Sequence, residues 1–196
     1  MTTSTSLQPT LIEAMGRNGS GITRNLVLAV AGSVALWLSA KIQVPFYPVP
    51  MTMQTFVVLM IGMAYGWRLG AATVLLYLAE GAMGLPVFAN TPERGIGLAY
   101  MMGPTGGYLA GFAVSAAVVG WLAARGWDRH IVTALLAMTL GTAIILALGN
   151  LWLGYLIGWD KPVLQVGLLP FLPGAAFKIA LAAAVLPTVW KFVARD

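Results

Sequence analysis

The stretch IVTALLAMTLGTAIILALGNLWLGYLIG, residues 131–158, contains no charged side chain. It exceeds the length of about 20 residues that an α-helix needs to cross a bilayer. Further apolar runs of this kind recur along the chain. The spans that we place are 22–40, 52–67, 69–85, 106–124, 131–158 and 172–193. The sequence therefore predicts an all-α membrane protein with a bundle of six transmembrane helices.

The composition agrees with this class and excludes several others. Of the 196 residues 59% are hydrophobic and only 9% are charged, against about 25% in a soluble domain. There is no cysteine, so disulfides and thiolate metal sites are excluded. The formal net charge is +5, but the basic residues are scattered singly and form no stripe. We therefore expect the lipid bilayer as a partner, and no nucleic acid.

Residues 1–21 are polar and predict a disordered cytoplasmic tail, followed by a single transmembrane domain over residues 22–196. A signal peptide is the alternative for the apolar stretch after Arg24. We favour a first membrane helix, because the apolar run is long and no small-residue cleavage site follows it.

Basic residues predict the orientation, because they favour cytoplasmic loops. With a cytoplasmic N-terminus, seven basic residues lie inside: Arg17, Arg24, Arg68, Arg125, Arg129, Lys191 and Arg195. Three lie outside: Lys41, Arg94 and Lys161. Both termini are therefore expected in the cytoplasm. The outer loops are the longer ones and are rich in Pro and Gly, so we expect the functional residues there.

The first candidate site is the outer loop KIQVPFYPVPMTMQT, residues 41–55. Its prolines cannot continue a helix, so the loop should be stiff and lose little entropy on binding. Phe46 and Tyr47 would supply apolar faces, and Gln54 an amide. A plain connector with a helix N-cap is the alternative.

The second candidate is YMMGPTGGY, residues 100–108, at the start of the fourth span. Thr105 and the amides of Gly106 and Gly107 would donate hydrogen bonds there, since helix N-termini favour anions. The flanking aromatic residues are Tyr100 and Tyr108. A simple turn with an N-cap is again the alternative, and no Gly-Lys-Ser/Thr follows that would make a phosphate loop.

Polar residues inside the spans form a third set, namely Glu80, Asn150 and Lys178. Ionisable groups at this depth are costly and usually functional. Lys178 suits the binding of a carboxylate. The alternatives are snorkelling of the lysine to the interface and a structural role for Glu80, for instance as the ion-pair partner of Lys178.

Small residues four apart, Ala31 and Ala35, give the first span a surface on which another helix can dock closely. No metalloprotease, serine hydrolase or nucleotide-binding motif is present in the chain. We therefore predict no enzyme activity and no cofactor.

Three motifs, in this order, resemble the BioY family, the biotin-binding S components of energy-coupling factor (ECF) transporters. They are PVPMTMQT at 48–55, GAMGLPVF at 81–88 and GPTGGYL at 103–109. The resemblance runs from about residue 39 to 184. It implies an S-component fold of six helices in a bacterial plasma membrane, and capture of biotin from outside.

The resemblance also implies partners, a transmembrane coupling protein and ABC-type ATPases, with Ala31 and Ala35 on the docking surface for the coupling protein. It places the vitamin among the outer loops, the start of the fourth helix and the start of the sixth. In the family the sixth helix commonly begins with an acid three residues before a lysine. Here Lys178 is present, but Ala175 replaces the acid.

Biotin suits these residues chemically. Its ureido ring needs hydrogen-bond donors and acceptors, its thioether ring needs apolar walls, and its carboxylate pairs with Lys178. An S component for another vitamin is one alternative. A small membrane-embedded enzyme that uses Glu80 and Lys178 as an acid–base pair is the other.

Overall fold

The computed structural model describes residues 8–15, 21–44 and 47–193, which fold into helices and one short hairpin. The helices are α1 Leu11–Met15, α2 Ile22–Lys41, α3 Gln54–Ala82, α4 Gly97–Met101, α5 Gly106–Ala123, α6 Ile131–Ile157, α7 Val163–Gly167 and α8 Phe171–Val193. The strands are β1 Gln43–Val44 and β2 Met51–Thr52. They pair antiparallel, with Gln43 opposite Thr52.

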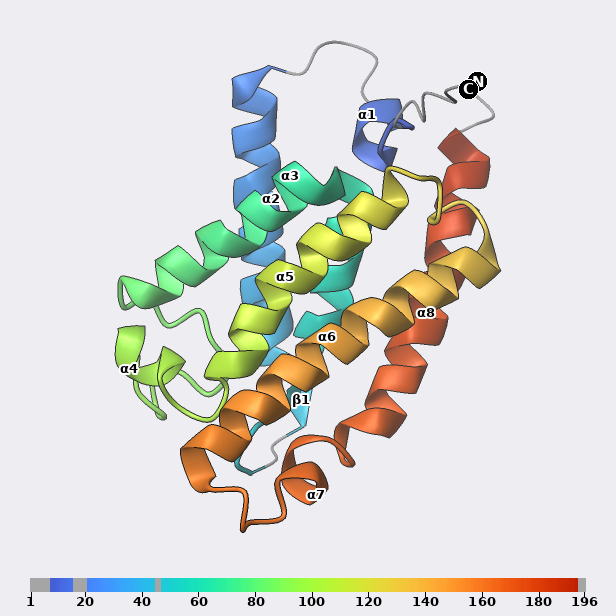
Figure 1. Cartoon of the computed structure of the whole chain (residues 1–196). Helices are drawn as coiled ribbons and strands as arrows, with labels where there is room; N and C mark the ends of the chain where they lie inside the picture. The colour runs from blue at the N-terminus through green and yellow to red at the C-terminus, as the bar shows by residue number, and fades with distance from the viewer. Residues whose placement is uncertain (1–7, 16–20, 45–46, 194–196) are drawn as a thin grey trace, which may run out of the picture.

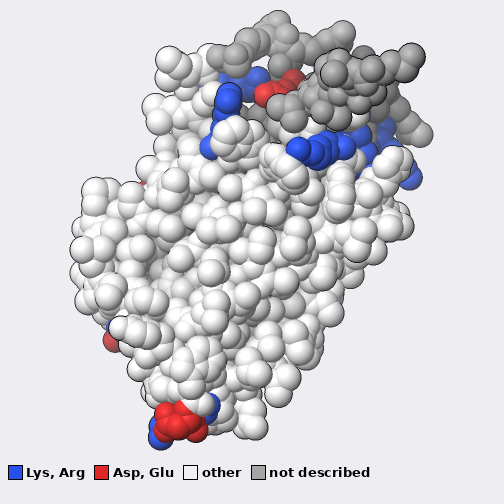
Figure 2. Space-filling model, viewed as in Figure 1, with Lys and Arg blue, Asp and Glu red and all other residues white. Residues whose placement is uncertain are grey.

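The described residues contain five helical segments that are long and apolar enough to cross a membrane. They are Ile22–Lys41, Gln54–Ala82, Gly106–Ala123, Ile131–Ile157 and Val163–Val193. Figure 2 shows a broad belt of uncharged surface, with Lys and Arg gathered at the end that carries α1 and the last turns of α8. The predicted all-α membrane class is confirmed. The cytoplasmic placement of the basic end remains a prediction.

Helix α3, Gln54–Ala82, contains most of both of the spans predicted at 52–67 and 69–85. The two are joined at Gly66, whose φ of 77° and ψ of 175° are not helical. Glycine is required at such a φ because it has no Cβ. Beyond the bend the chain folds back, so that the Gln54 side-chain amide lies 2.6 Å from the Tyr77 hydroxyl. The element is therefore a helical hairpin, with a first arm over 54–65 and a second arm over 67–82.

The first arm is short. At 1.5 Å per residue, residues 54–65 extend over about 18 Å, less than a hydrocarbon core of about 30 Å. The extended β1–β2 segment leads directly into this arm and supplies the missing depth. Irregular backbone at membrane depth is tolerated only where protein buries it or where it lines a cavity. The backbone beside Gln54 is therefore expected either to be covered by protein or to line a cavity.

Helices α3, α5 and α6 pack side by side in the centre, while α2 lies on α3 and α8 on α6 (Figure 1). Glycines permit the close central contacts. A Cβ at Gly111 of α5 would lie 2.9 Å from the Cα of Ile145 in α6. By contrast, α2 buries only one side against α3 and exposes apolar side chains such as Val27 and Leu38.

The segment expected to be a disordered tail contains the short helix α1. Thr10 and Glu13 form a reciprocal capping box. The Thr10 amide donates to Glu13 Oε2 at 2.8 Å, and the Glu13 amide donates to Thr10 Oγ1 at 3.4 Å. Leu11 is buried, and the amide of Gln8 donates to the carbonyl of Ala124 at 2.9 Å. These contacts hold residues 8–15 against the end of the bundle beside the bend of α3, which explains the difference from the expectation.

A buried carboxylate joins the loop between α5 and α6 to α8. Asp128 is only 1% exposed, and its Oδ2 accepts a hydrogen bond of 2.5 Å from the indole of Trp190. The guanidinium of Arg129 lies 4.5 Å from the centre of the same indole. Burial raises the pKa of the Asp128 carboxyl, and the bond from Trp190 and the charge of Arg129 oppose this rise only in part.

This raised pKa predicts a pH-dependent stability. Between the ordinary pKa of 3.8 and the raised value, the folded protein holds a proton that the unfolded chain releases. Stability should therefore fall as the pH rises through that window and then level off. We expect Asp128→Asn to flatten this fall in thermal melts of the detergent-solubilised protein between pH 4 and 8. The control is Asp160→Asn, at an exposed acid. Identical pH profiles for wild type and Asp128→Asn would contradict the assignment.

Candidate ligand-binding site

A cavity lies beside Gln54, in the half of the bundle away from α1. It contains about 520 Å³ of space not filled by atoms, counted to its open mouth. Its walls come from the segment before α3, the loop 83–105, helices α5 and α6, and the start of α8. The lining residues are Val49, Pro50, Thr52, Gln54, Thr55, Phe88, Ala89, Tyr100, Thr105, Tyr108, Leu109, Phe112, Ile145, Leu146, Phe171 and Lys178.

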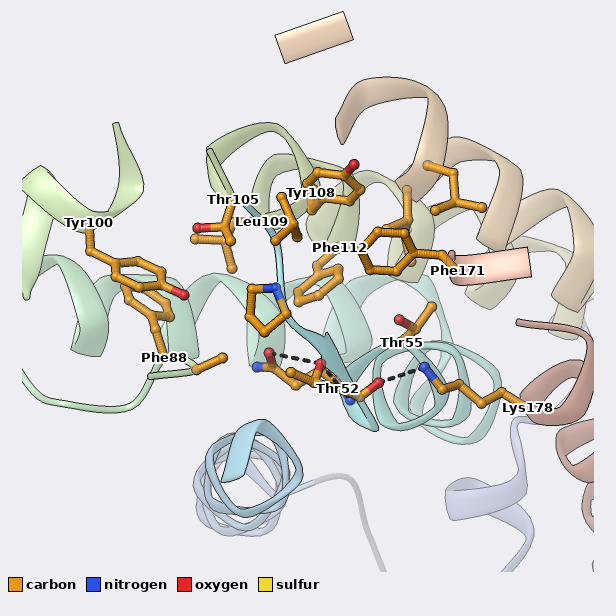
Figure 3. A pocket seen from close by; sticks show the side chains of 16 residues that line it. Thr52, Thr55, Phe88, Tyr100, Thr105, Tyr108, Leu109, Phe112, Phe171 and Lys178 are labelled. Atoms are coloured by element: carbon orange, nitrogen blue, oxygen red, sulfur yellow. Dashed lines mark hydrogen bonds between the residues drawn. The ribbon is translucent and has the colours of Figure 1, made fainter. Parts of the chain in front are cut away.

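The cavity has two chemically different ends, which Figure 3 shows on opposite sides. At one end the rings of Phe88 and Tyr100 stack with centroids 5.0 Å apart. At the other, Lys178 reaches in from α8, and its Nζ donates to the carbonyl of Thr52 at 2.5 Å. Apolar side chains such as Leu109 and Phe112 lie between the two ends.

Lys178 is the charged residue of the lining, and the described residues place no carboxylate within ion-pair distance of it. Its hydrogen-bond partner is a neutral carbonyl. A protonated amine among apolar side chains is costly unless an anion compensates it. The cavity is therefore suited to a ligand that carries a negative charge at this end.

Gln54 is held rigidly at the floor of the cavity. Its amide donates to the Tyr77 hydroxyl at 2.6 Å, and that hydroxyl donates to the carbonyl of Val87 at 3.0 Å. The amide of Gln54 also accepts from the Thr52 hydroxyl at 3.4 Å. This buried chain of bonds connects both arms of α3 to the loop that carries Phe88.

At the aromatic end, burial raises the pKa of Tyr100 above its usual value, and the hydroxyl of Thr105 and the charge of Arg94 act in the opposite direction. The phenol therefore stays neutral at physiological pH and can donate a hydrogen bond to a ligand. Tyr108 contributes its ring, which stacks on Phe171 at 5.9 Å, while its hydroxyl donates to the carbonyl of Gly167 at 2.7 Å.

The two loops that carry Val49 and Phe88 form part of the cavity wall and are bonded to each other. Lys41 Nζ donates to the carbonyls of Pro86 and Phe88, each at 3.1 Å, and to that of Thr91 at 3.2 Å. The Arg94 guanidinium donates back to the carbonyl of Pro48 at 3.1 Å. We call the segments 47–50 and 86–94 together the outer cover.

The structure places five of the predicted site residues on the lining: Gln54, Tyr100, Thr105, Tyr108 and Lys178. Phe46 lies outside the described residues. Tyr47 is 79% exposed and lies under the guanidinium of Arg94, at the outer surface rather than on the lining.

Glu80 and Asn150 also lie away from the lining. Glu80 accepts a hydrogen bond from the Ser33 hydroxyl of α2, so it connects two helices and is not paired with Lys178. Asn150 donates to the carbonyls of Leu146 and Gly167, at 2.8 and 3.1 Å. These bonds connect the end of α7 to α6, outside the lining of the cavity.

The two glycines at the start of α5 serve packing rather than the lining. The Gly106 amide donates to the carbonyl of Gly103 at 3.0 Å, and a side chain on Gly107 would overlap Trp152 of α6. Trp152 in turn donates from its indole to Gly103 at 2.9 Å. These contacts position Thr105 and Tyr108 on the lining.

Several lining residues were not predicted, among them Thr52, Thr55, Phe88, Phe112 and Phe171. Thr52 and Thr55 flank Gln54, and Phe88 ends the GAMGLPVF motif, so the motifs themselves contained a signal for these three. Phe112 and Phe171 stand in apolar runs, where nothing distinguishes them from residues that face lipid.

An apolar helical bundle with a cavity bounded by an aromatic stack and a lysine has the form of a multi-pass membrane protein with a site suited to a small organic anion. The chain belongs to the BioY family, whose model matches residues 4–195.

Relatives with the same family name are similar over most of their length. The probable biotin transporter BioY of Pyrococcus horikoshii is 36% identical over 160 residues, covering 81% of this chain and 92% of the relative. The biotin transporter BioY of Thermotoga maritima is 36% identical over 162 residues, covering 83% and 93%. The crystal structure of the S-component for biotin from an ECF-type ABC transporter superposes with a TM-score of 0.72. It covers 90% of this chain and 95% of that chain at 21% identity, and so shows a shared fold.

The bond chain at the floor of the cavity yields a stability prediction. Tyr77→Phe should lower the free energy of unfolding by about 1–3 kcal/mol, because the Gln54 amide and the Val87 carbonyl lose a buried partner. Unfolding in mixed micelles, followed by tryptophan fluorescence, measures the change. Tyr155→Phe is the matched control, since Tyr155 is 79% exposed. Equal unfolding midpoints for the two variants would disprove the stabilising role of these hydrogen bonds.

Proposed function

We propose that this chain is the high-affinity biotin-binding subunit of a vitamin uptake transporter and captures biotin from the outer side of the membrane. The named biotin transporters among its relatives support the ligand. The cavity supports it independently. One end offers aromatic and hydroxyl side chains for a ring, and the other end offers a cation for an acid.

The observation that carries the proposal is the separation of Lys178 from the Phe88–Tyr100 stack (Figure 3). Biotin has a fused bicyclic ring system at one end and a carboxylate at the other, joined by an aliphatic chain. The ring would lie against the stack, with its ureido group bonded to Tyr100 and Thr105. The apolar middle of the cavity would receive the aliphatic chain, and Lys178 would pair with the carboxylate.

The absence of the family acid leaves Lys178 available to the ligand. With Ala175 in place of that acid, no carboxylate of the described residues competes for Lys178. The ammonium is then free to pair with the ligand. A cationic vitamin such as thiamin would be repelled by the same charge.

The position of Glu80 argues against the acid–base alternative. The side chain bonds to Ser33 and does not reach the cavity, so it cannot exchange a proton with a ligand bound near Lys178. Mass spectrometry of the ligand released from the detergent-purified protein tests all three alternatives. Stoichiometric, unmodified biotin supports the proposal, whereas another vitamin or a converted lipid would refute it.

Removal of the cation should weaken biotin binding. We expect Lys178→Ala to cost about 1.5–3 kcal/mol, the range for a hydrogen bond to a charged group, which corresponds to roughly 10- to 150-fold in Kd. Titration calorimetry in detergent measures the change. Lys161→Ala is the control, since Lys161 is an exposed loop residue paired with Asp160. An unchanged Kd in Lys178→Ala would remove this residue from the site.

The partners of the proposed transporter are an ECF coupling protein and ABC-type ATPases, which would supply the energy. The exposed side of α2 is the proposed docking surface. Ala31 is exposed and Ala35 half-buried, whereas Gly32 and Leu36 turn inward onto α3. A helix of the coupling protein would pack closely over the small side chains.

A tryptophan on this surface should block assembly but spare the ligand. We expect Ala31→Trp or Ala35→Trp to bind biotin normally and to lose co-purification with the co-expressed coupling protein and ATPases of the same genome. The matched controls are Ala143→Trp and Ala147→Trp, at a pair of exposed alanines with the same spacing on α6. Normal co-purification of the α2 variants would exclude this surface.

A further inference from the structure

A second hollow adjoins the aromatic end of the cavity, between the outer cover and the segment 99–105. It contains about 790 Å³ of space not filled by atoms, counted to its open mouth. Pro50, Tyr100 and Thr105 line both this hollow and the cavity, so the two spaces share a wall. We call this hollow the vestibule.

Arg94 is the charged residue of the vestibule lining. The residue is exposed, and its guanidinium donates to the Pro48 carbonyl at 3.1 Å and lies 5.8 Å from the centre of the Tyr47 ring. Both of these partners are neutral. A guanidinium has five N–H donors, and the bond to Pro48 uses one of them. Arg94 can therefore bind an anion in the vestibule without losing the bond to Pro48.

No carboxylate competes for this guanidinium. The described residues place no acid within ion-pair distance of Arg94. Glu93 and Lys41 line a separate hollow together with Arg94 and are not on the vestibule lining. The ammonium of Lys41 is bonded to three carbonyls. Arg94 is thus the cation that an anion meets in the vestibule.

The charge of Arg94 also acts at the wall that the vestibule shares with the cavity. Burial raises the pKa of Tyr100, and the positive charge of Arg94 is one of the influences that oppose this rise. Lys178 lies at the end of the cavity opposite Tyr100 (Figure 3). An anion that passes from the vestibule through the cavity therefore meets two cations in succession, one at each end.

We propose that Arg94 captures the carboxylate of incoming biotin in the vestibule, before that carboxylate reaches Lys178. The proposal rests on the proposed function, which takes bound biotin to have its ring at the Phe88–Tyr100 stack and its acid at Lys178. Because the stack adjoins the vestibule, biotin that enters there has to pass the stack with its acid end first. The acid end is the end that Arg94 attracts.

The two cations should then act on different rate constants. A charge at the rim of a site mainly changes the association rate and its salt dependence, whereas a buried charge pair mainly changes the dissociation rate. Arg94 is exposed at the rim and Lys178 belongs to the cavity. The alternative role for Arg94 is purely structural, through its bond to Pro48, and that role does not depend on the charge of the ligand.

The association of radiolabelled biotin with the full-length protein in an uncharged detergent, sampled by rapid filtration, tests the proposal. At about 0.01 M salt, where charges act over about 30 Å, we expect Arg94→Gln to lower the association rate constant about threefold. The difference should shrink at about 0.15 M salt, where that length is about 8 Å. The dissociation rate constant should not change. Lys161→Gln, the matched control, removes the same charge from an exposed loop residue and should associate like wild type.

A conservative variant and a neutral ligand separate charge from structure. Arg94→Lys keeps the positive charge, so it should retain most of the association rate even if the bond to Pro48 is altered. Radiolabelled biotinamide has no carboxylate, so it should associate equally fast with wild type and with Arg94→Gln.

Equal association rates for wild type and Arg94→Gln at low salt would overturn the proposal. An equal loss of rate in Arg94→Lys, or an equal loss for biotinamide, would overturn it in favour of the structural role. Faster dissociation from Arg94→Gln would also overturn it, by placing Arg94 in the site of bound biotin. If wild type does not bind biotin at all, the proposed function itself is refuted, and the role of Arg94 with it.

Discussion

The site depends on the hydrogen bond between Gln54 and Tyr77. It joins the start of the first arm of α3 to the second arm, and through the Val87 carbonyl it fixes the loop that presents Phe88. The bend at Gly66 makes this contact possible, since it turns the chain back on itself. A first arm too short to cross the membrane brings extended backbone down to this bond, and the cavity is the space that forms beside it.

The helices were largely predictable because apolar composition over about 20 residues is a strong signal. The predicted spans 22–40, 106–124, 131–158 and 172–193 agree with α2, α5, α6 and α8 to within two residues at each end. The spans predicted at 52–67 and 69–85 correspond to the two arms of α3, which the structure joins at Gly66 without an intervening loop. Hydropathy cannot distinguish such a joint from a loop. The α1 helix had a local signal, the Thr10-x-x-Glu13 capping box, but its burial depends on contacts with Ala124 and Gly66 that lie far away in the sequence.

The site was predictable where residue type alone carries the chemistry. A lysine within an apolar span, and tyrosine and threonine beside a Gly-Pro turn, are conspicuous in the sequence, and Lys178, Tyr100 and Thr105 do lie on the lining. Glu80 and Asn150 were equally conspicuous. Their partners Ser33 and Gly167 could be known only from helix rotation. The direction in which a helical side chain points is decided by packing, and in spans apolar on all sides the sequence contains no periodicity to reveal it.

The bonds of the outer cover have a mechanical consequence. Lys41 holds three carbonyls of one covering segment, and Arg94 of that segment holds a carbonyl of the other. Separation of the two segments breaks the bond from Arg94 to the Pro48 carbonyl, and movement of 86–94 away from α2 breaks the bonds from Lys41. The position of 86–94 is thereby coupled to the end of α2 and, through Arg94, to the segment 47–50. Motion of α2 would then be transmitted directly to the mouth of the cavity, by the helix whose opposite side is free for a partner.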